Sequence, residues 1–370
     1  MRTFLARTFF AAAFAAAALS LAALTPAAHA WSHKEHIQFT RLAAMRIVAD
    51  PAAPQDLKDW LKANTQLLPT MEAEREWFLH QAIGLEVEKA GLTGLTWWVT
   101  VPDVEALDRR APKKPPFGQQ ERLNHFIDLE FFNPVNEKKT YQLDLSSLPA
   151  MQDIPRDFKD PTYVRAGYLP LAREDAYKNF VAAIRAGKLE PAKNKPEDQD
   201  HALRWCGYLA HYTQDNTQPH HATMDYKSAQ YFKGMKNSPN VHAEMEYRMA
   251  DEASQPLPEL RAEYWPLFEA RLNEIKQDDV GDADIFESTI AVAMDSYKNL
   301  PLIGNAAVAA VDTTDMKKPT IDTTKFFKFV GTVDGREQSV MEMKAHQTAW
   351  AVIRTENVIK QAWAAAKQPQ

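Results

Sequence analysis

Apolar residues recur at helical spacing over most of the chain. Within residues 33–49, Ile37, Leu42 and Ile47 fall close to one face of a helix, and the pattern stops at Pro51. Prolines fall mainly between such stretches, where helices are expected to end, because proline cannot donate the hydrogen bond that continues a helix. The pattern predicts helices over residues 33–49, 54–65, 71–90, 120–131, 171–187, 198–216, 240–253, 257–277, 282–299 and 337–366.

Two stretches interrupt the helical pattern. Residues 102–119 are rich in proline and lysine, which predicts a loop. Residues 312–335 favour β-structure, and we expect a short hairpin around Phe326–Val333. Because no internal repeat or low-complexity linker divides the chain, the sequence predicts one all-α domain over residues 31–370, with loop insertions and one short β-hairpin.

The first 30 residues differ from the rest of the chain. Arg2 and Arg7 precede an apolar run that ends in Ala28-His29-Ala30, a pattern typical of a secretory signal peptide and its cleavage site. A retained membrane anchor is the alternative, but the apolar run is short for a bilayer span. We therefore expect a mature chain that begins at Trp31, has no transmembrane segment and is periplasmic or secreted.

Composition excludes several classes of site. The single cysteine, Cys206, excludes an intramolecular disulfide framework and a thiolate-rich metal site. Twelve glycines in 370 residues, roughly half the usual ~7%, argue against glycine-rich nucleotide loops. The formal net charge is −6, and removal of the leader with its two arginines makes it more negative. Overall charge therefore gives no attraction to nucleic acid or anionic lipid, so chemistry on phosphates would need local positive charge, for which metal ions are the obvious source.

Histidines gather beside carboxylates in four segments, namely 31–36, 124–128, 211–221 and 240–246. The pairs His211/Asp215 and His242/Glu246 have i, i+4 spacing, which places both side chains about 6 Å apart on one helix face. Imidazole and carboxylate without thiolate suit Zn²⁺. A single such pair is more often a solvated surface pair, but two pairs close together, with another histidine after the first, favour a metal site.

Removal of the predicted signal peptide would create a further candidate metal ligand. Cleavage after Ala30 exposes the α-amine of Trp31, whose unperturbed pKa is about 8 and which a metal can deprotonate. The amine and carbonyl of one residue form a five-membered chelate ring. An N-terminal tryptophan can therefore bind a metal through two backbone atoms.

This order of residues resembles a known superfamily. An N-terminal Trp, then His, Asp, His, H-x-x-x-D, His and H-x-x-x-[DE] is similar to the zinc-dependent phospholipases C and single-strand-specific zinc nucleases. The resemblance covers Trp31 to about Asp251, and the extra segments 130–200 and 300–370 have no assigned role. It implies an all-helical secreted phosphodiesterase with three zinc ions. It implies no protein partner.

The resemblance implies a role for each matching residue. One ion would be held by Asp103, His125, His211 and Asp215, a second by Trp31, His36 and the bridging Asp215, and a third by His221, His242 and Glu246. Asp103 and Asp215 would be the catalytic carboxylates, and a hydroxide bridging the paired ions would attack phosphorus. The third ion would neutralise charge that develops in the transition state.

Four of these positions have a rival close in sequence. The family's aspartate is often followed by arginine or preceded by proline, so Asp108 competes with Asp103. Spacing prefers the assigned residue in the other three cases. The pairs of assigned residue and rival are His36 and His33, His221 and His220, and Glu246 and Glu244.

The metal ligands do not separate the two branches of the superfamily. His125-Phe126-Ile127-Asp128 resembles the nucleases, in which the residues matching Phe126 and Asp128 stack on and hydrogen-bond a nucleobase. Glu246 and Ala222 resemble the phospholipases instead, and Phe126 is alternatively a core residue. The balance favours a nuclease for single-stranded DNA or RNA. A phospholipase C acting on phosphatidylcholine-like lipids and a non-catalytic secreted zinc-binding protein are the alternatives.

Overall fold

The computed structural model describes residues 31–81, 83, 87–107, 121–132, 154–156, 166–191, 199–251, 257–276 and 284–369. The expected signal peptide (1–30), Asp108 and most of 130–165 lie outside the described residues. Within the described residues the chain is helical apart from two short hairpins, which confirms the all-α prediction. No described helix is both long and apolar enough to cross a membrane.

The helices vary from single turns to 28 residues. The α-helices are α1 (His33–Ala49), α2 (Gln55–Asn64), α3 (Met71–His80), α4 (Gly94–Trp98), α5 (Val101–Leu107), α6 (Leu169–Arg185), α7 (Ala202–Asp215), α8 (Val241–Ala243), α9 (Pro258–Glu274), α10 (Ile285–Tyr297), α11 (Leu300–Ala310), α12 (Thr323–Lys328) and α13 (Val340–Lys367). The 3₁₀ turns are η1 (Val87–Ala90), η2 (Glu121–Asn124), η3 (Leu129–Phe132), η8 (Pro219–Ala222) and η9 (Ala229–Phe232), and η10 (Glu244–Arg248) is a π-helix.

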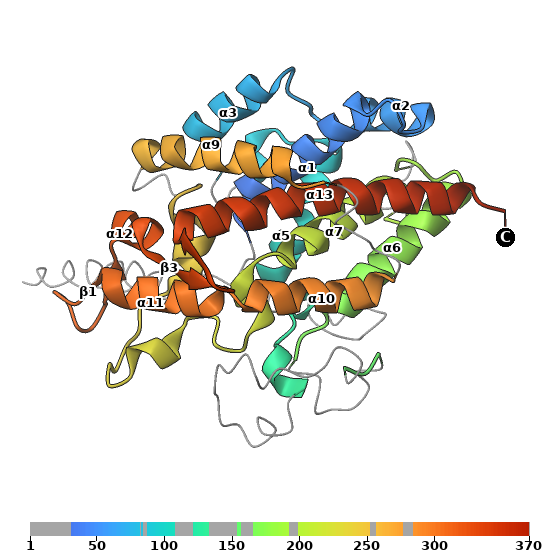
Figure 1. The fold of residues 1–370 in the computed structure, drawn as a ribbon. Coiled ribbons are helices and arrows are strands. Elements are labelled where there is room, and N and C mark those ends of the chain that lie inside the picture. The colour runs from blue at the N-terminus through green and yellow to red at the C-terminus, as the bar shows by residue number, and fades with distance from the viewer. Residues whose placement is uncertain are drawn as a thin grey trace, which may run out of the picture.

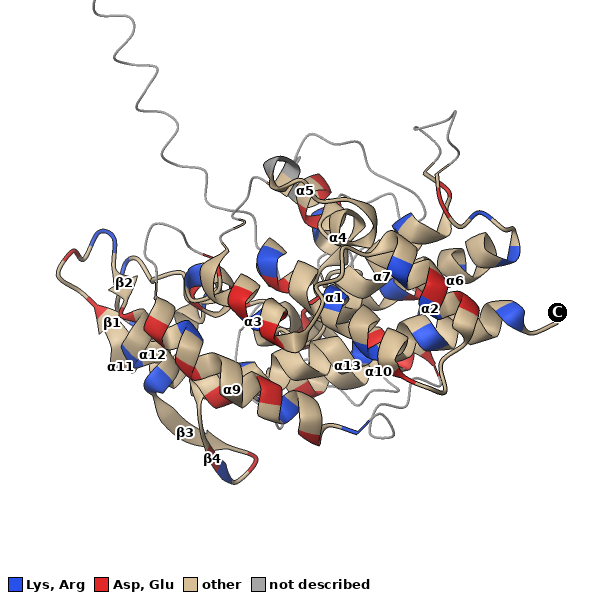
Figure 2. Ribbon diagram, turned by 90° about the horizontal axis from the view of Figure 1, so that it is seen from above, with Lys and Arg blue, Asp and Glu red and all other residues tan. Residues whose placement is uncertain are grey.

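The C-terminal helix α13 is the central helix of the fold. It runs across the middle of the view in Figure 1, with α1, α3 and α9 on one side and α10 and α11 on the other. It packs against α1, α6, α7 and α9, and is buried on several faces. Capping boxes begin both α13 (Ser339 with Glu342) and α1 (Ser32 with Glu35) and satisfy amides of the first turn. Acidic and basic residues are interspersed along the outer helices (Figure 2).

The prediction of a helix over 120–131 is wrong. Two 3₁₀ turns, η2 and η3, flank non-helical residues around His125. The backbone there bonds to distant segments, since Ile127 N donates to His221 O at 2.8 Å and Asp128 N donates to Ala166 O at 2.6 Å. Long-range hydrogen bonds replace the local ones that a helix would need, and a periodicity argument cannot detect them.

Other boundaries also differ from expectation. The loop predicted over 102–119 begins instead with α5, and α3 ends at His80 although the prediction continued to residue 90. The predicted helix over 240–253 is a short α8 followed by the π-helix η10, and α11 was not predicted. The remaining predicted helices lie close to their expected positions.

The structure contains two hairpins where one was expected. β1 (Val311–Asp312) pairs with β2 (Thr320–Ile321), and β3 (Val330–Val333) pairs with β4 (Arg336–Ser339), both antiparallel. The predicted hairpin is thus shifted toward the C-terminus, and Phe326 lies on α12. Asp334 and Gly335 have positive φ angles of 48° and 77°, which a two-residue turn between right-twisted strands requires.

A close contact between α4 and α7 positions the residues that follow α4. A Cβ atom built on Gly207 would lie 2.6 Å from the backbone carbon of Trp98. Because only glycine leaves room for this approach, α4 packs directly on α7. The carbonyl of Val99, which follows α4, thereby reaches His211.

A fully buried ion pair joins the two ends of the chain. Lys344 Nζ of α13 lies 2.8 Å from Glu35 Oε1 of α1, and it donates to Met245 O at 2.5 Å. The same ammonium lies 5.0 Å from the centroid of the Trp31 ring. Desolvation lowers the pKa of Lys344 and raises that of Glu35, so each charge depends on the other for compensation.

We predict that Lys344→Met, in protein that begins at Trp31, lowers the free energy of unfolding by about 3–5 kcal/mol, because it leaves Glu35 buried without its cation. The double variant Glu35→Gln/Lys344→Met should recover a large part of this loss. Denaturant unfolding measures both.

The matched control is Lys325→Met, which removes an exposed ion pair with Asp322 and should change stability by less than about 1 kcal/mol. An equally small loss for Lys344→Met would contradict the prediction.

Candidate metal centre

Asp215, at the C-terminal end of α7, lies among three imidazoles. Its Oδ1 is 3.4 Å from His36 Nε2, and its Oδ2 is 2.9 Å from His125 Nδ1 and 3.2 Å from His211 Nε2. Three segments supply these rings, namely α1, the stretch after η2, and α7 itself. The i, i+4 geometry of one helix accounts for His211 only, so tertiary packing brings the other two.

Asp103 of α5 is the second carboxylate of the cluster. Its Oδ1 lies 3.6 Å from His211 Nε2 and 3.7 Å from His125 Nδ1. Its Oδ2 lies 3.3 Å from His33 Nε2 and 3.9 Å from His36 Nε2. We name these six fully buried residues the paired cluster: His33, His36, Asp103, His125, His211 and Asp215.

Two imidazoles of the paired cluster are oriented by hydrogen bonds at their Nδ1 atoms. His211 Nδ1 donates to the carbonyl of Val99 at 2.8 Å, and His36 Nδ1 lies 2.7 Å from Gln214 Oε1. A carbonyl oxygen only accepts, so the proton of neutral His211 sits on Nδ1 and its Nε2 lone pair faces the carboxylates. Histidines that bind metals in proteins typically show this arrangement, with the other ring nitrogen bonded to an oxygen.

The electrostatics of the paired cluster are dominated by its two carboxylates. Burial opposes charge on Asp215, but the positive charge of His211 and the hydrogen bonds from His125 and His211 outweigh it and lower the pKa of Asp215. Burial would also lower the pKa of His211, yet the charges of Asp215 and Asp103 raise it to about 9. Burial and the neighbouring His211 lower the pKa of His36 to about 3.

A second group lies beside the paired cluster. We name His221 of η8, His242 of α8 and Glu246 of η10 the third-ion cluster. His242 Nε2 is 3.6 Å from Glu246 Oε2, and the rings of His221 and His242 have centroids 5.2 Å apart. His221 Nδ1 donates to the carbonyl of His125 at 2.5 Å, which joins the two clusters.

Glu246 is an unusual residue to find buried. Desolvation raises its pKa well above the ordinary value, and the negative charges of Asp103, Glu35 and Asp215 raise it further. Within the part of the chain that the structure describes, Glu246 Oε1 and His36 Nε2 are buried and make no hydrogen bond. Cations bound at the two clusters would satisfy these atoms separately and offset the crowded negative charge.

Two of the sequence rivals have other partners. His220 Nε2 lies 3.1 Å from Ser228 Oγ, and Glu244 accepts from Thr323 Oγ1 at 2.8 Å and pairs with Arg248 at 3.5 Å. Glu246 is therefore the carboxylate whose geometry fits the third-ion cluster, whereas His220 and His221 lie at similar distances from His242, with ring centroids 5.4 Å and 5.2 Å away.

His33 was set aside from sequence, yet it belongs to the paired cluster through Asp103. Its i, i+3 spacing from His36, which places both on one helix face, is the signal that would have found it. The structure places Asp103 in this cluster too, whereas its rival Asp108 lies outside the described residues.

Trp31 is held at the C-terminal end of α7. Its side chain is fully buried, and its Nε1 donates to Gln214 O at 2.9 Å and to Thr217 Oγ1 at 3.2 Å. The ring also packs edge-on against Phe39, with centroids 6.1 Å apart. The first residue of the predicted mature chain is thus anchored at the end of α7.

Phe126 and Asp128 follow His125 in the non-helical stretch. Phe126 is half-buried, and its backbone and ring lie so close to Gly167 that a Cβ there would be 2.1 Å from Phe126 O. Asp128 is buried, and desolvation followed by the charge of Glu130 raises its pKa well above the ordinary value. A protonated Asp128 is able to donate as well as accept a hydrogen bond.

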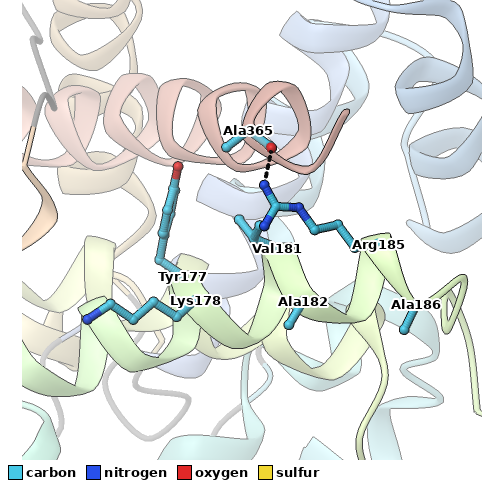
Figure 3. A pocket seen from close by; sticks show the side chains of 7 residues that line it. All are labelled: Tyr177, Lys178, Val181, Ala182, Arg185, Ala186 and Ala365. Carbon is cyan, nitrogen blue, oxygen red and sulfur yellow. Dashed lines mark hydrogen bonds between the residues drawn. The ribbon is translucent and has the colours of Figure 1, made fainter. Parts of the chain in front are cut away.

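An open pocket lies elsewhere, between α6 and the C-terminal end of α13 (Figure 3). Arg185 Nη2 donates there to Ala365 O at 2.9 Å. None of its lining residues is a predicted site residue; they are Tyr177, Lys178, Val181, Ala182, Arg185, Ala186 and Ala365.

The paired cluster has a donor set that fits a metal. Within each of two triads, His36/Asp103/His211 and His125/His211/Asp215, one ligand atom per residue lies within 4.8 Å of the others. Nitrogen and oxygen donors of this kind bind zinc in proteins. Comparison of the chain with protein-family models, curated proteins and solved structures found no match.

Proposed function

We propose that this protein is a zinc-dependent phosphodiesterase of the phospholipase C and single-strand nuclease type. One observation carries the proposal: Asp103 and Asp215 are buried side by side against imidazoles whose Nε2 atoms face them. Two buried carboxylates repel one another unless positive charge lies between them. Protonated His211 supplies one such charge in metal-free protein, and bound cations would supply it when metal displaces that proton.

The distances within the paired cluster support its part of the assignment made from sequence, and the other ligands are proposed from the resemblance. Asp103, His125, His211 and Asp215 would hold one ion, Trp31, His36 and Asp215 a second, and His221, His242 and Glu246 a third. His33 would orient Asp103 through the 3.3 Å contact. This ligand set requires removal of residues 1–30, so we propose that the protein is exported and processed.

Zinc ions in such a set would polarise a phosphoryl oxygen and activate water at neutral pH. The chain's own contribution is to hold the donors rigidly, because each ligand residue is buried. Asp215 is kept ionised by its imidazoles, as a shared ligand must be. Phe126, next to His125, would be the platform for the group attached to the phosphate.

The partial exposure of Phe126 next to His125 favours single-stranded nucleic acid, because an aromatic ring beside the site could stack on a base. Phospholipid is the second candidate, and Tyr226 favours it. This side chain is 42% exposed, and its ring centroid lies 6.0 Å from that of His242. An aromatic ring at the rim of the site suits a quaternary ammonium headgroup.

Metal content tests the proposal most directly. We expect protein that begins at Trp31 to carry about three zinc ions per chain by elemental analysis, and dialysis against a chelator should lower its melting temperature, because bound metal stabilises the folded state. Asp215→Asn should lose the paired ions and keep the third. A wild-type protein with only trace metal would rule out the proposed centre.

A comparison of substrates separates the nuclease from the phospholipase. Phe126→Ala should lower hydrolysis of single-stranded DNA about 10- to 100-fold, the loss of one stacking contact of ~1–3 kcal/mol, and change hydrolysis of a small chromogenic phosphodiester much less. Tyr226→Ala is the matched control and should spare DNA hydrolysis.

Release of phosphocholine from phosphatidylcholine vesicles, with loss in Tyr226→Ala, would identify the phospholipase branch instead. Bound zinc without turnover of any diester would favour a non-catalytic zinc-binding protein.

Metal uptake should also release protons. In metal-free protein at pH 7.5, His211 is protonated because its pKa is raised to about 9, so zinc must displace at least one proton per chain. The proton released from His211 should diminish as the pH rises through 9. Titration calorimetry in buffers of different ionisation enthalpy measures this number, and a binding enthalpy independent of buffer would contradict it.

A further inference from the structure

Gln214 immediately precedes Asp215 on α7 and is fully buried. Its side-chain amide contacts His36 and two threonines, and its backbone carbonyl contacts Trp31. The ligand pattern in the sequence assigns Gln214 no role. Its hydrogen bonds, however, reach the N-terminal residue, α1 and α13.

The orientation of the Gln214 amide is determined by two threonines. Its Nε2 lies 2.9 Å from Thr40 Oγ1 and 3.3 Å from Thr355 Oγ1. Thr355 Oγ1 donates its own hydrogen to Ala351 O at 2.7 Å, so toward the amide it can only accept. The nitrogen end of the amide therefore faces the threonines, and the oxygen end faces His36.

This orientation selects one tautomer of His36. Gln214 Oε1 only accepts, and it lies 2.7 Å from His36 Nδ1, which must then carry the proton. The lone pair consequently sits on His36 Nε2, 3.4 Å from Asp215 Oδ1 and 3.9 Å from Asp103 Oδ2. In the other tautomer, Nε2 would carry a hydrogen and could not bind a cation.

The backbone of the same residue anchors Trp31. Gln214 O accepts from Trp31 Nε1 at 2.9 Å and from Thr217 Oγ1 at 2.8 Å. Trp31, His36 and Asp215 are the three residues assigned to the second ion. Gln214 contacts the first two and precedes the third in sequence.

We infer that Gln214 is a positioning residue for the second ion of the paired cluster, presenting His36 in its metal-binding tautomer and holding Trp31 at the C-terminal end of α7. This inference rests on the proposed metal centre. It also gives the C-terminal segment a role, because Thr355 of α13 orients the amide. If Gln214 were only structural, its substitution would lower the stability of the protein without a selective change in its affinity for the second ion.

The test compares Gln214→Leu with wild type in protein that begins at Trp31. We expect the leucine variant to bind the second zinc ion about 10- to 100-fold more weakly in chelator competition, with the third-ion cluster unchanged. Nitrogen NMR of the histidine rings should show His36 as the Nδ1–H tautomer in metal-free wild type and as a mixture in the variant.

Two further variants separate positioning from packing. Gln214→Glu keeps an acceptor toward His36, so His36 should remain the Nδ1–H tautomer in the metal-free variant. Gln347→Leu removes another buried amide, on α13, and should leave zinc affinity unchanged. Should Gln214→Leu fail to fold, the double variant Thr40→Val/Thr355→Val removes both contacts that orient the amide and should weaken binding of the same ion.

The inference is overturned if Gln214→Leu binds the second ion as tightly as wild type, or if His36 keeps a single Nδ1–H tautomer without Gln214. Failure of the proposed function is a different result, namely a wild-type protein that binds no zinc. The tautomer measurement on metal-free protein still tests Gln214 in that case.

Discussion

Two carboxylates, Asp103 and Asp215, are buried together against four imidazoles, and this concentration of polar groups is the constraint around which the helices are arranged. Removing an ionised carboxylate from water is costly unless charge and hydrogen bonds compensate it. Here the compensating imidazoles come from α1, α7 and the stretch after η2. Only His211 shares a helix with a carboxylate that it contacts, so the site and the fold depend on each other.

The helix α13 supports this arrangement from outside. Through Lys344 it neutralises Glu35 and covers the ring of Trp31, and through Thr355 it orients Gln214. The segment 300–370 had no assigned role in the resemblance, yet its Lys344 contacts the ring of Trp31, the first residue of the predicted mature chain. The proposed removal of the leader and the final helix would therefore act on the same few residues.

The predictions made from sequence were correct where the structure depends on residues that are close together in the chain. The i, i+4 spacing of His211 and Asp215 and of His242 and Glu246 brought each pair within about 4 Å, because helix geometry depends only on neighbouring residues. The helix expected over 120–131 failed because Ile127 and Asp128 bond to distant carbonyls. His33 was missed because spacing relative to Trp31 says nothing about where Asp103 lies.

The sequence by itself determined the helical class of the fold, the candidate ligand residues and the absence of thiolate ligands, since these follow from periodicity, spacing and composition. Only the tertiary structure decided which of those side chains meet. Convergence of α1, α5 and α7 depends on contacts between residues more than a hundred positions apart, such as Trp31 Nε1 with Gln214 O. Such contacts arise from packing against a shared core, which no local pattern encodes.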